Sequence, residues 1–281
     1  GQNSIMSDVT IVSVGFESAA VLPGMLDSIP TGNPIVLVDN NSTDETAQIA
    51  QEHGATTLRL TANTGFGVAC NIGAARVTTP FVLFLNPDAR LMPGALDALL
   101  ASAKQHPQAS AFNPALFGNN GRPKNRRGST IAPQLGRRAT QSVAEDTVTP
   151  ILSGSALFCR LEAFNKVGGF DEAIFMYHED DDLSLRLTRD IGPLMLCANA
   201  KVVHLGSASS PPSNDIVFQK AKYRAISRLY AERKHGRRAV ILRLIGRTTA
   251  TVFSPYNLVS RRHIAKTSGT VVGTMAVLRG H

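Results

Sequence analysis

The stretch PIVLVDNNSTDET, residues 34–46, indicates best how this chain folds. An apolar run of strand length ends at Asp39, and a polar turn then leads into a segment with the composition of a helix. Similar apolar runs occur at 9–16, 56–62 and 80–87, and helical patterns lie between them. Strands that alternate with helices in this way build a mostly parallel sheet covered by helices. The sequence therefore predicts an α/β fold.

Two helix starts are expected in this part of the chain. Ser42 and Glu45 have the spacing of a capping box, so one helix is expected to begin just after them. A second helix is expected after Pro93, because proline is well suited to a first helical turn.

The length and composition suit one large domain, or one domain with an appendage. The chain has 281 residues, 43% of them apolar, and no visible repeat. Three widely spaced cysteines without a CxxC pair argue against a disulfide framework and a zinc site, and they fit a reducing compartment. Residues 1–5 are excluded from the fold prediction, and no signal sequence is recognised. The longest uncharged C-terminal stretches are shorter than the about 20 residues of a membrane span, so we expect a soluble or peripheral protein.

The net charge of +8 is divided unevenly along the chain. Residues 1–216 hold 15 Lys and Arg against 20 Asp and Glu, whereas residues 217–281 hold 14 against the single Glu232. Such a tail is typical of nucleic-acid binding or of contact with an anionic membrane. The chain has no Trp and no aromatic-rich basic platform, which disfavours nucleic acid.

The basic tail is predicted to begin with a helix over 216–232. Lys220, Arg224 and Arg228 would share one face, and an apolar arc would cover most of the rest and is expected to pack on the main domain. A more distal basic segment is expected to be attracted reversibly to anionic lipid. Its members are Arg233, Lys234, Arg237, Arg238, Arg261 and Arg262.

Carboxylates follow two of the predicted strands. Asp39 ends the run at 34–40, and Asp88 follows the run at 80–87. Ligands of open α/β sheets bind beyond the carboxyl ends of the strands, although turns use Asp for their own reasons. His204 ends a further predicted strand region, 194–206, and is interpreted as a surface or hydrogen-bonded residue unless Asp88 holds a metal.

Glycines follow the third predicted strand in NTGFGVACNIGAA, residues 63–75. Backbone at glycine can approach a ligand closely. The stretch lacks the full GxGxxG of a dinucleotide site, because Cys70 stands at the third glycine position. A nicotinamide oxidoreductase is therefore disfavoured.

Four adjacent carboxylates, Glu179 to Asp182, stand in the stretch FMYHEDDDLSLRL, residues 175–187. The spacing of Leu183 and Leu187 predicts a helix from near Asp181, where acids are favoured by about 0.3–1 kcal/mol each. Asp182 could also form a surface pair with Arg186. A helix start explains Asp181 and Asp182 better than the first two acids.

Crowded carboxylates also suit chemistry. They raise one another's pKa unless a cation or a proton joins them. One of them is therefore expected to be a base whose pKa its neighbours raise toward neutrality, and the helix-start interpretation remains open beside this one.

Five motifs occur in a characteristic order: VLVDNNSTDET, NTGFGVACNIGAA, FLNPDA, GGFDEAIFMYHEDDDLSLRL and VVHLG. Over about residues 8–207 the chain resembles glycosyltransferase family 2, and within it the bacterial rhamnosyltransferase-type enzymes of cell-envelope polysaccharide assembly. The resemblance implies a GT-A fold, a dTDP-, UDP- or GDP-sugar donor, Mn²⁺ or Mg²⁺, inversion at the anomeric carbon, and a saccharide or polyprenyl-linked acceptor. With the reducing compartment and the basic tail, it leads us to expect a cytoplasmic location, peripheral at the inner face of the cytoplasmic membrane.

The resemblance and the composition together predict the domain organisation. A catalytic domain over 6–215 would comprise a nucleotide-sugar-binding half (8–117), a polar, basic mobile loop (118–150) and an acceptor half (151–215). Residues 216–281 would form the basic, partly amphipathic helical region.

The resemblance also implies roles for individual residues. Glu179 and Asp180 match the family's ED pair, whose Asp is the expected base. Asn86-Pro87-Asp88 occupies the position of the metal-binding DxD motif, with Asn86 in place of the first acid, so Asp88 becomes the main metal ligand, with His204 near it. The residues expected to bind the donor are Asp39, Asn41, Asp44, Asn63, Gly65, Asn71, Asn86 and Asp88.

Two other classes of protein remain as alternatives. A nucleotide-sugar-binding protein without turnover would keep the regions of Asp39 and Asp88 but would need no base, so the intact ED pair argues against it. A nucleotidyltransferase on a similar fold would release pyrophosphate instead of a nucleoside diphosphate.

Overall fold

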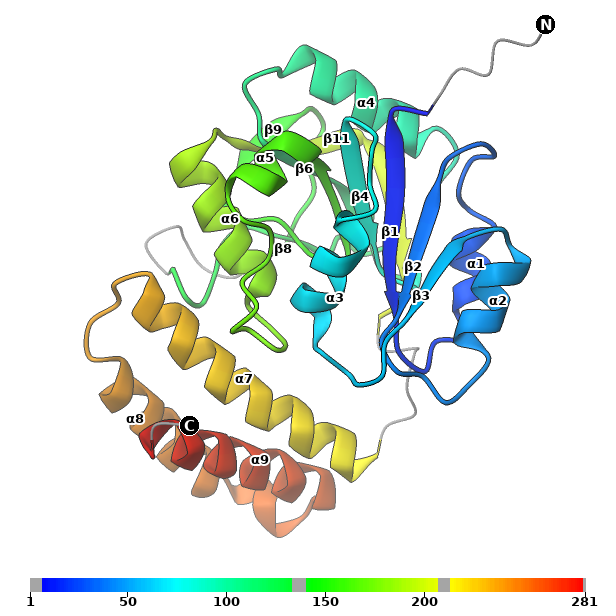
Figure 1. The fold of residues 1–281 in the computed structure, drawn as a ribbon. Coiled ribbons are helices and arrows are strands. Elements are labelled where there is room, and N and C mark those ends of the chain that lie inside the picture. Colours follow the sequence, from blue (N-terminus) through cyan, green and yellow to red (C-terminus); the bar gives the residue numbers. More distant parts are fainter. Residues whose placement is uncertain (1–6, 133–139, 207–212, 280–281) are drawn as a thin grey trace, which may run out of the picture.

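The computed structural model describes residues 7–132, 140–206 and 213–279. Among them, nine strands form one sheet in the order β3-β2-β1-β4-β10-β6-β11-β5, with β9 also pairing with β11 (Figure 1). The strands of this sheet are β1 (Val9–Gly15), β2 (Ile35–Asp39), β3 (Thr56–Arg59), β4 (Phe81–Leu85), β5 (Ala89–Leu91), β6 (Ala111–Phe117), β9 (Thr147–Thr149), β10 (Ala156–Arg160) and β11 (Leu194–His204). A second, two-stranded sheet pairs β7 (Asn125–Arg126) with β8 (Thr140–Gln141).

The first four strands run parallel, as the sequence predicts. β1 pairs in parallel with β2 and β4, and β2 pairs in parallel with β3. β10 then lies antiparallel between β4 and β6, so the second half of the sheet is mixed. The predicted α/β class is confirmed, and the carboxyl ends of β2 and β4 lie at the same edge of the sheet.

Helices cover both faces of the sheet (Figure 1). Those of the α/β part are α1 (Leu22–Leu26), α2 (Thr46–Glu52), α3 (Phe66–Ala74), α4 (Ala95–Gln105), α5 (Leu161–Lys166) and α6 (Glu179–Asp190). One core joins the sheet to α1, α2 and α4, and the other joins it to α3, α5 and α6. Leu83 belongs to the first core and its neighbour Phe84 to the second, because successive side chains of a strand point to opposite faces.

The predicted capping box is wrong. α2 begins at Thr46, and Asp44, not Ser42, accepts the hydrogen bond from the Thr46 backbone N–H, at 3.0 Å. The Ser42 hydroxyl instead accepts from the Glu17 N–H at 3.1 Å, so it holds the loop after β1. α4 does follow Pro93, but its first residue is Ala95.

The segment 118–150 is more structured than the predicted loop. Its described residues contribute β7, β8 and β9, and Ile131 and Ala132 are buried. Residues 133–139 of the predicted loop lie outside the described residues.

The C-terminal region is helical, as predicted. It contains α7 (Asn214–Lys234), α8 (Val240–Val252), a 3₁₀ turn η2 (Pro255–Leu258) and α9 (Arg261–Leu278). α7 lies nearest the α/β part, and α8 and α9 lie beyond it (Figure 1). The backbones of α9 and α7 can pack closely because Gly269 has no Cβ. A Cβ at this position would lie 2.2 Å from the Phe218 carbonyl oxygen. In the described part of the chain no helix combines the length and apolarity that a membrane span requires.

Candidate active site

The four adjacent carboxylates form the first turn of α6, which begins at Glu179, two residues earlier than predicted. Tyr177 and His178 precede the helix with φ of 69° each, a left-handed conformation that L-residues adopt rarely. This turn directs the acids into the molecule. The structure gives the four acids different environments.

Asp180 is held at the wall of a cavity. Its Oδ2 accepts from Arg126 Nη2 at 2.7 Å and from the Gly154 backbone N–H at 3.0 Å. Arg126 Nη1 also forms an ion pair with Asp181 Oδ1 at 2.8 Å, so one guanidinium joins two neighbouring carboxylates. Arg126 comes from β7, inside the segment that the sequence presents as a polar loop.

Glu179 lines the same cavity but lacks the partners that hold Asp180. Its Oε2 atom is buried and has no hydrogen-bond partner among the described residues. Burial, reinforced by the adjacent charge of Asp180, raises the pKa of Glu179 to about 8. Burial and the neighbouring charges therefore favour the neutral, protonated form of Glu179.

Asp181 and Asp182 do not merely start the helix, so that prediction is wrong. Asp181 is 1% exposed, and its Oδ2 accepts from Ser129 Oγ at 2.8 Å and lies 3.1 Å from His178 Nδ1. Burial opposes ionisation of Asp181, but the contact with His178 and the charge of Arg126 lower its pKa.

Asp182 joins α6 to the C-terminal region. Its pair with Arg186, at 2.7 Å, is buried and does not lie on the surface as predicted. Asp182 Oδ1 also lies 2.8 Å from Lys234 Nζ and 2.9 Å from His235 Nε2, at the end of α7. Although burial opposes ionisation, His235, Lys234 and Arg186 lower the pKa of Asp182 to about 2.

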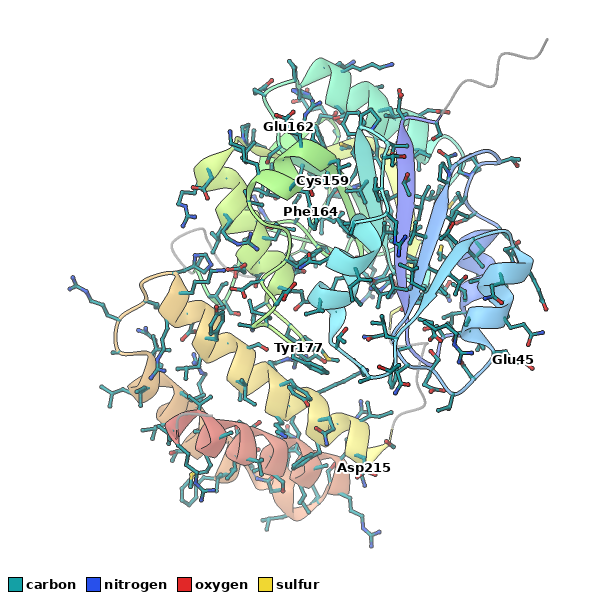
Figure 2. All side chains as sticks on the ribbon, in the orientation of Figure 1. Glu45, Cys159, Glu162, Phe164, Tyr177 and Asp215 are labelled. Atoms are coloured by element: carbon teal, nitrogen blue, oxygen red, sulfur yellow. The ribbon has the colours of Figure 1, made fainter. Side chains whose placement is uncertain are left out.

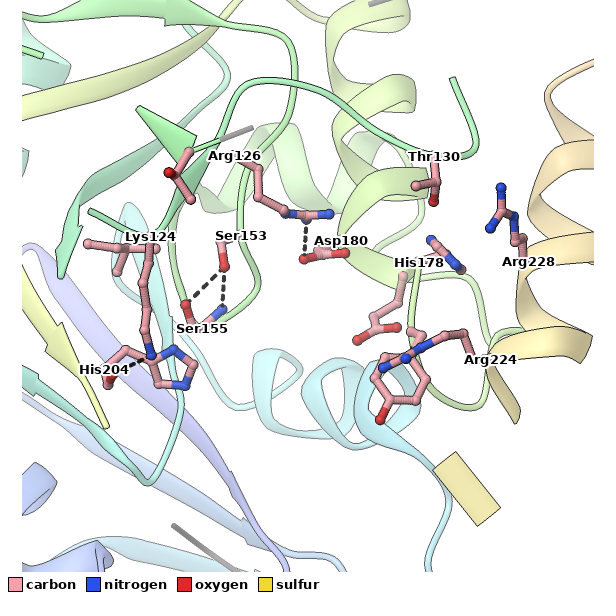
Figure 3. Close-up of a pocket in the computed structure, with 14 residues that line it drawn as sticks. Lys124, Arg126, Thr130, Ser153, Ser155, His178, Asp180, His204, Arg224 and Arg228 are labelled. Carbon is pink, nitrogen blue, oxygen red and sulfur yellow. Dashed lines mark hydrogen bonds and ion pairs between the residues drawn. The ribbon is translucent and has the colours of Figure 1, made fainter. Parts of the chain in front are cut away.

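A cavity of about 580 Å³ contains this acidic turn (Figure 3). Asp180 and Arg126 lie in its middle, Lys124 and His204 at one end, and Arg224 and Arg228 of α7 at the other. Its full lining among the described residues is Leu116, Lys124, Arg126, Thr130, Thr140, Ser153, Ser155, Tyr177, His178, Glu179, Asp180, His204, Arg224 and Arg228.

His204, at one end of this cavity, contacts Asp88, which is not itself part of the lining. The antiparallel pairing of β5 with β11 places His204 opposite Ala89, so its ring reaches Asp88, with Nε2 3.1 Å from Oδ1. Asp88 is 6% exposed. Burial opposes ionisation of Asp88, but the hydrogen bond and the charge of His204 lower its pKa.

Comparisons with known proteins agree with this geometry. Residues 19–168 match Glycosyl transferase family 2. An N-acetylglucosaminyl-diphospho-decaprenol L-rhamnosyltransferase of Mycobacterium tuberculosis is 32% identical, over 78% of this chain and 84% of that protein. The chain belongs to glycosyltransferase family 2.

Solved structures agree on the fold. TarS 1–349 of S. aureus superposes with a TM-score of 0.58 at 16% identity, over 97% of this chain and 92% of that one. The mannosyltransferase PcManGT from Pyrobaculum calidifontis, in complex with GDP-Man and Mn²⁺, gives 0.59 at 13%, over 96% and 87%. The protein is a glycosyltransferase with a GT-A fold, as predicted.

The predicted donor-binding residues of this glycosyltransferase lie outside the lining of the cavity. Asp39 ends β2 and is 1% exposed, with Oδ2 3.2 Å from Arg59 Nε and Oδ1 accepting from the Ser42 N–H. Asn41, next to it, is exposed with φ of 70°. Asp44 accepts from the Ala19 N–H at 2.9 Å, so it also supports the loop after β1.

Other members of that predicted set hold loops near the acidic turn. Asn63 Oδ1 accepts from the Gly65 N–H, and Asn71 exchanges two hydrogen bonds with the Phe170 backbone, each of 2.9 Å. The close approach at Gly65 is to protein, because a Cβ there would lie 2.3 Å from the Phe175 carbonyl oxygen. Asn86, partly exposed after β4, donates its backbone N–H to the Ser155 carbonyl oxygen at 3.0 Å.

The sequence did not indicate several cavity residues of this glycosyltransferase. Lys124 and Arg126 occur in the basic run GRPKNRRG, but nothing in that run tells which cations turn inward. The helical spacing predicts that Arg224 and Arg228 share one helix face, but it does not indicate that this face borders a cavity. The basic character of both segments was the only available signal.

Proposed function

We propose that this glycosyltransferase moves a sugar, rhamnose or another hexose, from a nucleoside-diphosphate sugar to a lipid-linked saccharide, with inversion. The Mycobacterium tuberculosis relative, named for L-rhamnosyl transfer to N-acetylglucosaminyl-diphospho-decaprenol, supports the substrates. The observation that carries the proposal is the position of Asp180 in the middle of the cavity, between Arg126 and the open space.

Asp180 is the proposed base. The acceptor hydroxyl oxygen attacks the anomeric carbon as the bond to the nucleoside diphosphate breaks, and the hydroxyl proton passes to Asp180. A positioned carboxylate in this role contributes typically about 10²–10⁴-fold. Arg126 and the Gly154 N–H orient Asp180, and protonated Glu179 can donate a hydrogen bond to the acceptor.

Asp88 and His204 are the proposed ligands of Mn²⁺ or Mg²⁺. Asp88 offers the carboxylate oxygen that such an ion prefers, and the ion would take its other ligands from diphosphate and water. His204 Nε2 lies 3.1 Å from Asp88 Oδ1 and would have to exchange this hydrogen bond for the ion. Among the described residues no group of three or more His, Cys, Asp or Glu side chains gathers as a metal site. When bound, the ion would stabilise the charge of the leaving diphosphate. Asn86 and Asp39 remain in the proposed donor site, together with Asn41, Asp44, Asn63, Gly65 and Asn71.

Transfer with purified protein tests this function and its metal together. With dTDP-rhamnose, UDP- and GDP-sugars as donors and a polyprenyl-diphospho-N-acetylglucosamine as acceptor, we expect one donor to give product and a nucleoside diphosphate. EDTA should abolish transfer and Mn²⁺ or Mg²⁺ should restore it, Asp88→Ala should lower it sharply, and His204→Ala less, because water can replace one neutral ligand. Release of pyrophosphate would indicate a nucleotidyltransferase, and full activity in EDTA would exclude the metal.

The surface of α8, η2 and α9 is the proposed membrane contact. Phe253, Leu258 and Val259 are 80%, 88% and 81% exposed at the turn between α8 and α9. The exposed cations here include Arg238, Arg261 and Arg262. In contrast, Lys234 pairs with Asp182 and Arg237 pairs with Glu232, so we no longer expect these two cations to bind lipid. Exposed apolar side chains among cations suit an anionic bilayer. The proposal places the enzyme peripherally at the inner face of the cytoplasmic membrane.

Sedimentation with vesicles tests this contact. We expect binding to vesicles that contain anionic lipid at low salt, weaker binding at high salt, and little binding to neutral vesicles. Arg261→Ser with Arg262→Ser should weaken binding by about tenfold or more, since each cation near the surface contributes about 1 kcal/mol. The exposed Arg189→Ser on α6 is the control, and absence of binding at low salt would exclude the contact.

A further inference from the structure

The cavity has a second cationic end, and it is formed by α7. Arg224 and Arg228 lie across the cavity from His204, with Asp180 between the two ends (Figure 3). The donor diphosphate is assigned above to the end with Asp88 and His204. The α7 end therefore faces the position of the other substrate.

Arg224 has no carboxylate partner among the described residues. Its guanidinium carbon lies 4.3 Å above the ring of Tyr177, in the space between the α/β part and α7 (Figures 2 and 3). Stacking on an aromatic ring restrains the planar guanidinium and leaves N–H donors at its edge for a ligand.

Arg228 belongs to a group of cations that a single carboxylate does not neutralise. The buried Glu232 lies 2.9 Å from Arg228 Nε, 2.8 Å from Arg237 Nη1 and 3.5 Å from Arg247 Nη2. Arg247 Nη2 and Glu232 Oε2 are buried and lack a hydrogen-bond partner within the described chain. Three guanidinium groups thus share one negative charge beside the cavity, which leaves a positive excess there.

We propose that Arg224 and Arg228 form a subsite for the diphosphate of the lipid-linked acceptor, an assignment that rests on the function proposed above. Guanidinium groups bind phosphate oxygens in pairs through their fixed fork of donors. With the acceptor hydroxyl at Asp180, the diphosphate on the other side of the sugar extends toward α7. The lipid then continues toward α8 and α9, which lie beyond α7 (Figure 1) and carry exposed apolar side chains.

Acceptor kinetics test this subsite through Arg224, which is exposed and whose loss leaves no buried carboxylate unpaired. Transfer is measured with polyprenyl-diphospho-N-acetylglucosamine and with an uncharged alkyl N-acetylglucosaminide. Arg224→Ala should raise KM for the diphosphate acceptor by about 10-fold or more, because it removes charge-assisted hydrogen bonds to the phosphate oxygens. KM for the alkyl glycoside and for the donor should not change. The control is Arg76→Ala, which removes an exposed cation just after α3, near the opposite edge of the sheet.

Each outcome separates the subsite from the overall function. An equal change for both acceptors, or a raised donor KM, would overturn the subsite while transfer itself stands. If the wild type transfers sugar to neither acceptor, calorimetry can still measure binding of the diphosphate lipid in the absence of donor, and this binding tests the subsite. Weaker binding by Arg224→Ala than by Arg76→Ala supports the subsite, and equal binding overturns it.

Discussion

Replacing Asp180 with asparagine is expected to lower sugar transfer by about 10²-fold or more while donor affinity stays near that of the wild type. Asparagine keeps the size of Asp180 and can still accept from the Gly154 N–H, but it cannot take the proton of the acceptor hydroxyl. The donor is assigned to the other end of the cavity, near Asp88 and His204. Single-turnover transfer and donor Kd, measured side by side with thermal unfolding, check the prediction. Wild-type transfer by Asp180→Asn, or loss of donor binding together with the fold, would contradict it.

Glu179→Gln is the matched comparison for that experiment. A glutamine resembles the protonated carboxyl that burial favours in Glu179, so transfer near pH 7 should change much less than in Asp180→Asn. The family's ED pair alone would predict an intermediate loss of transfer for Glu179→Gln. The difference between the two variants therefore separates the base from its protonated neighbour.

The parallel half of the sheet could be predicted because its signals are local. β1, β2 and β4 are buried on both faces, so each appears in the sequence as a continuous apolar run followed by a turn. The order in which β10, β6 and β11 join the sheet depends on contacts between distant segments. No periodicity in the sequence encodes that order.

The candidate site was predicted in part for the same reason. Asp88, His204 and Asp180 follow recognisable strands or motifs. The structure places His204 and Asp180 in the lining of one cavity and Asp88 in contact with His204. Two partners of Asp181, Ser129 and Arg126, lie far away in sequence: Ser129 is 52 residues from it. A local pattern can suggest that an acid starts a helix, but it cannot show that a distant serine or arginine neutralises it.

Asp182 shows the same limit most clearly, and its substitution should have a large effect on stability. Asp182→Ala removes the carboxylate shared by Arg186, Lys234 and His235, two of which belong to the C-terminal region. Removing one partner of a buried ion pair typically costs about 3–5 kcal/mol, whereas loss of a helix-start acid would cost only about 0.3–1 kcal/mol. We therefore expect Asp182→Ala to lower the free energy of unfolding several times more than the loss of a helix-start acid would.

Urea unfolding of Asp182→Ala beside Asp190→Ala decides between these interpretations. Asp190 lies on the same helix in an exposed pair with Arg189, and solvent screens such a pair, so its loss should hardly change the free energy of unfolding. Because the pKa of Asp182 is lowered to about 2 in the folded protein, its stabilising effect is present above the unfolded value of 3.8 and is lost as pH falls through 2. The difference between wild type and Asp182→Ala should accordingly shrink across that interval. Equal, small losses in both variants at neutral pH would return Asp182 to the role of a helix-start residue and would leave the attachment of α7 to the α/β part to its other contacts.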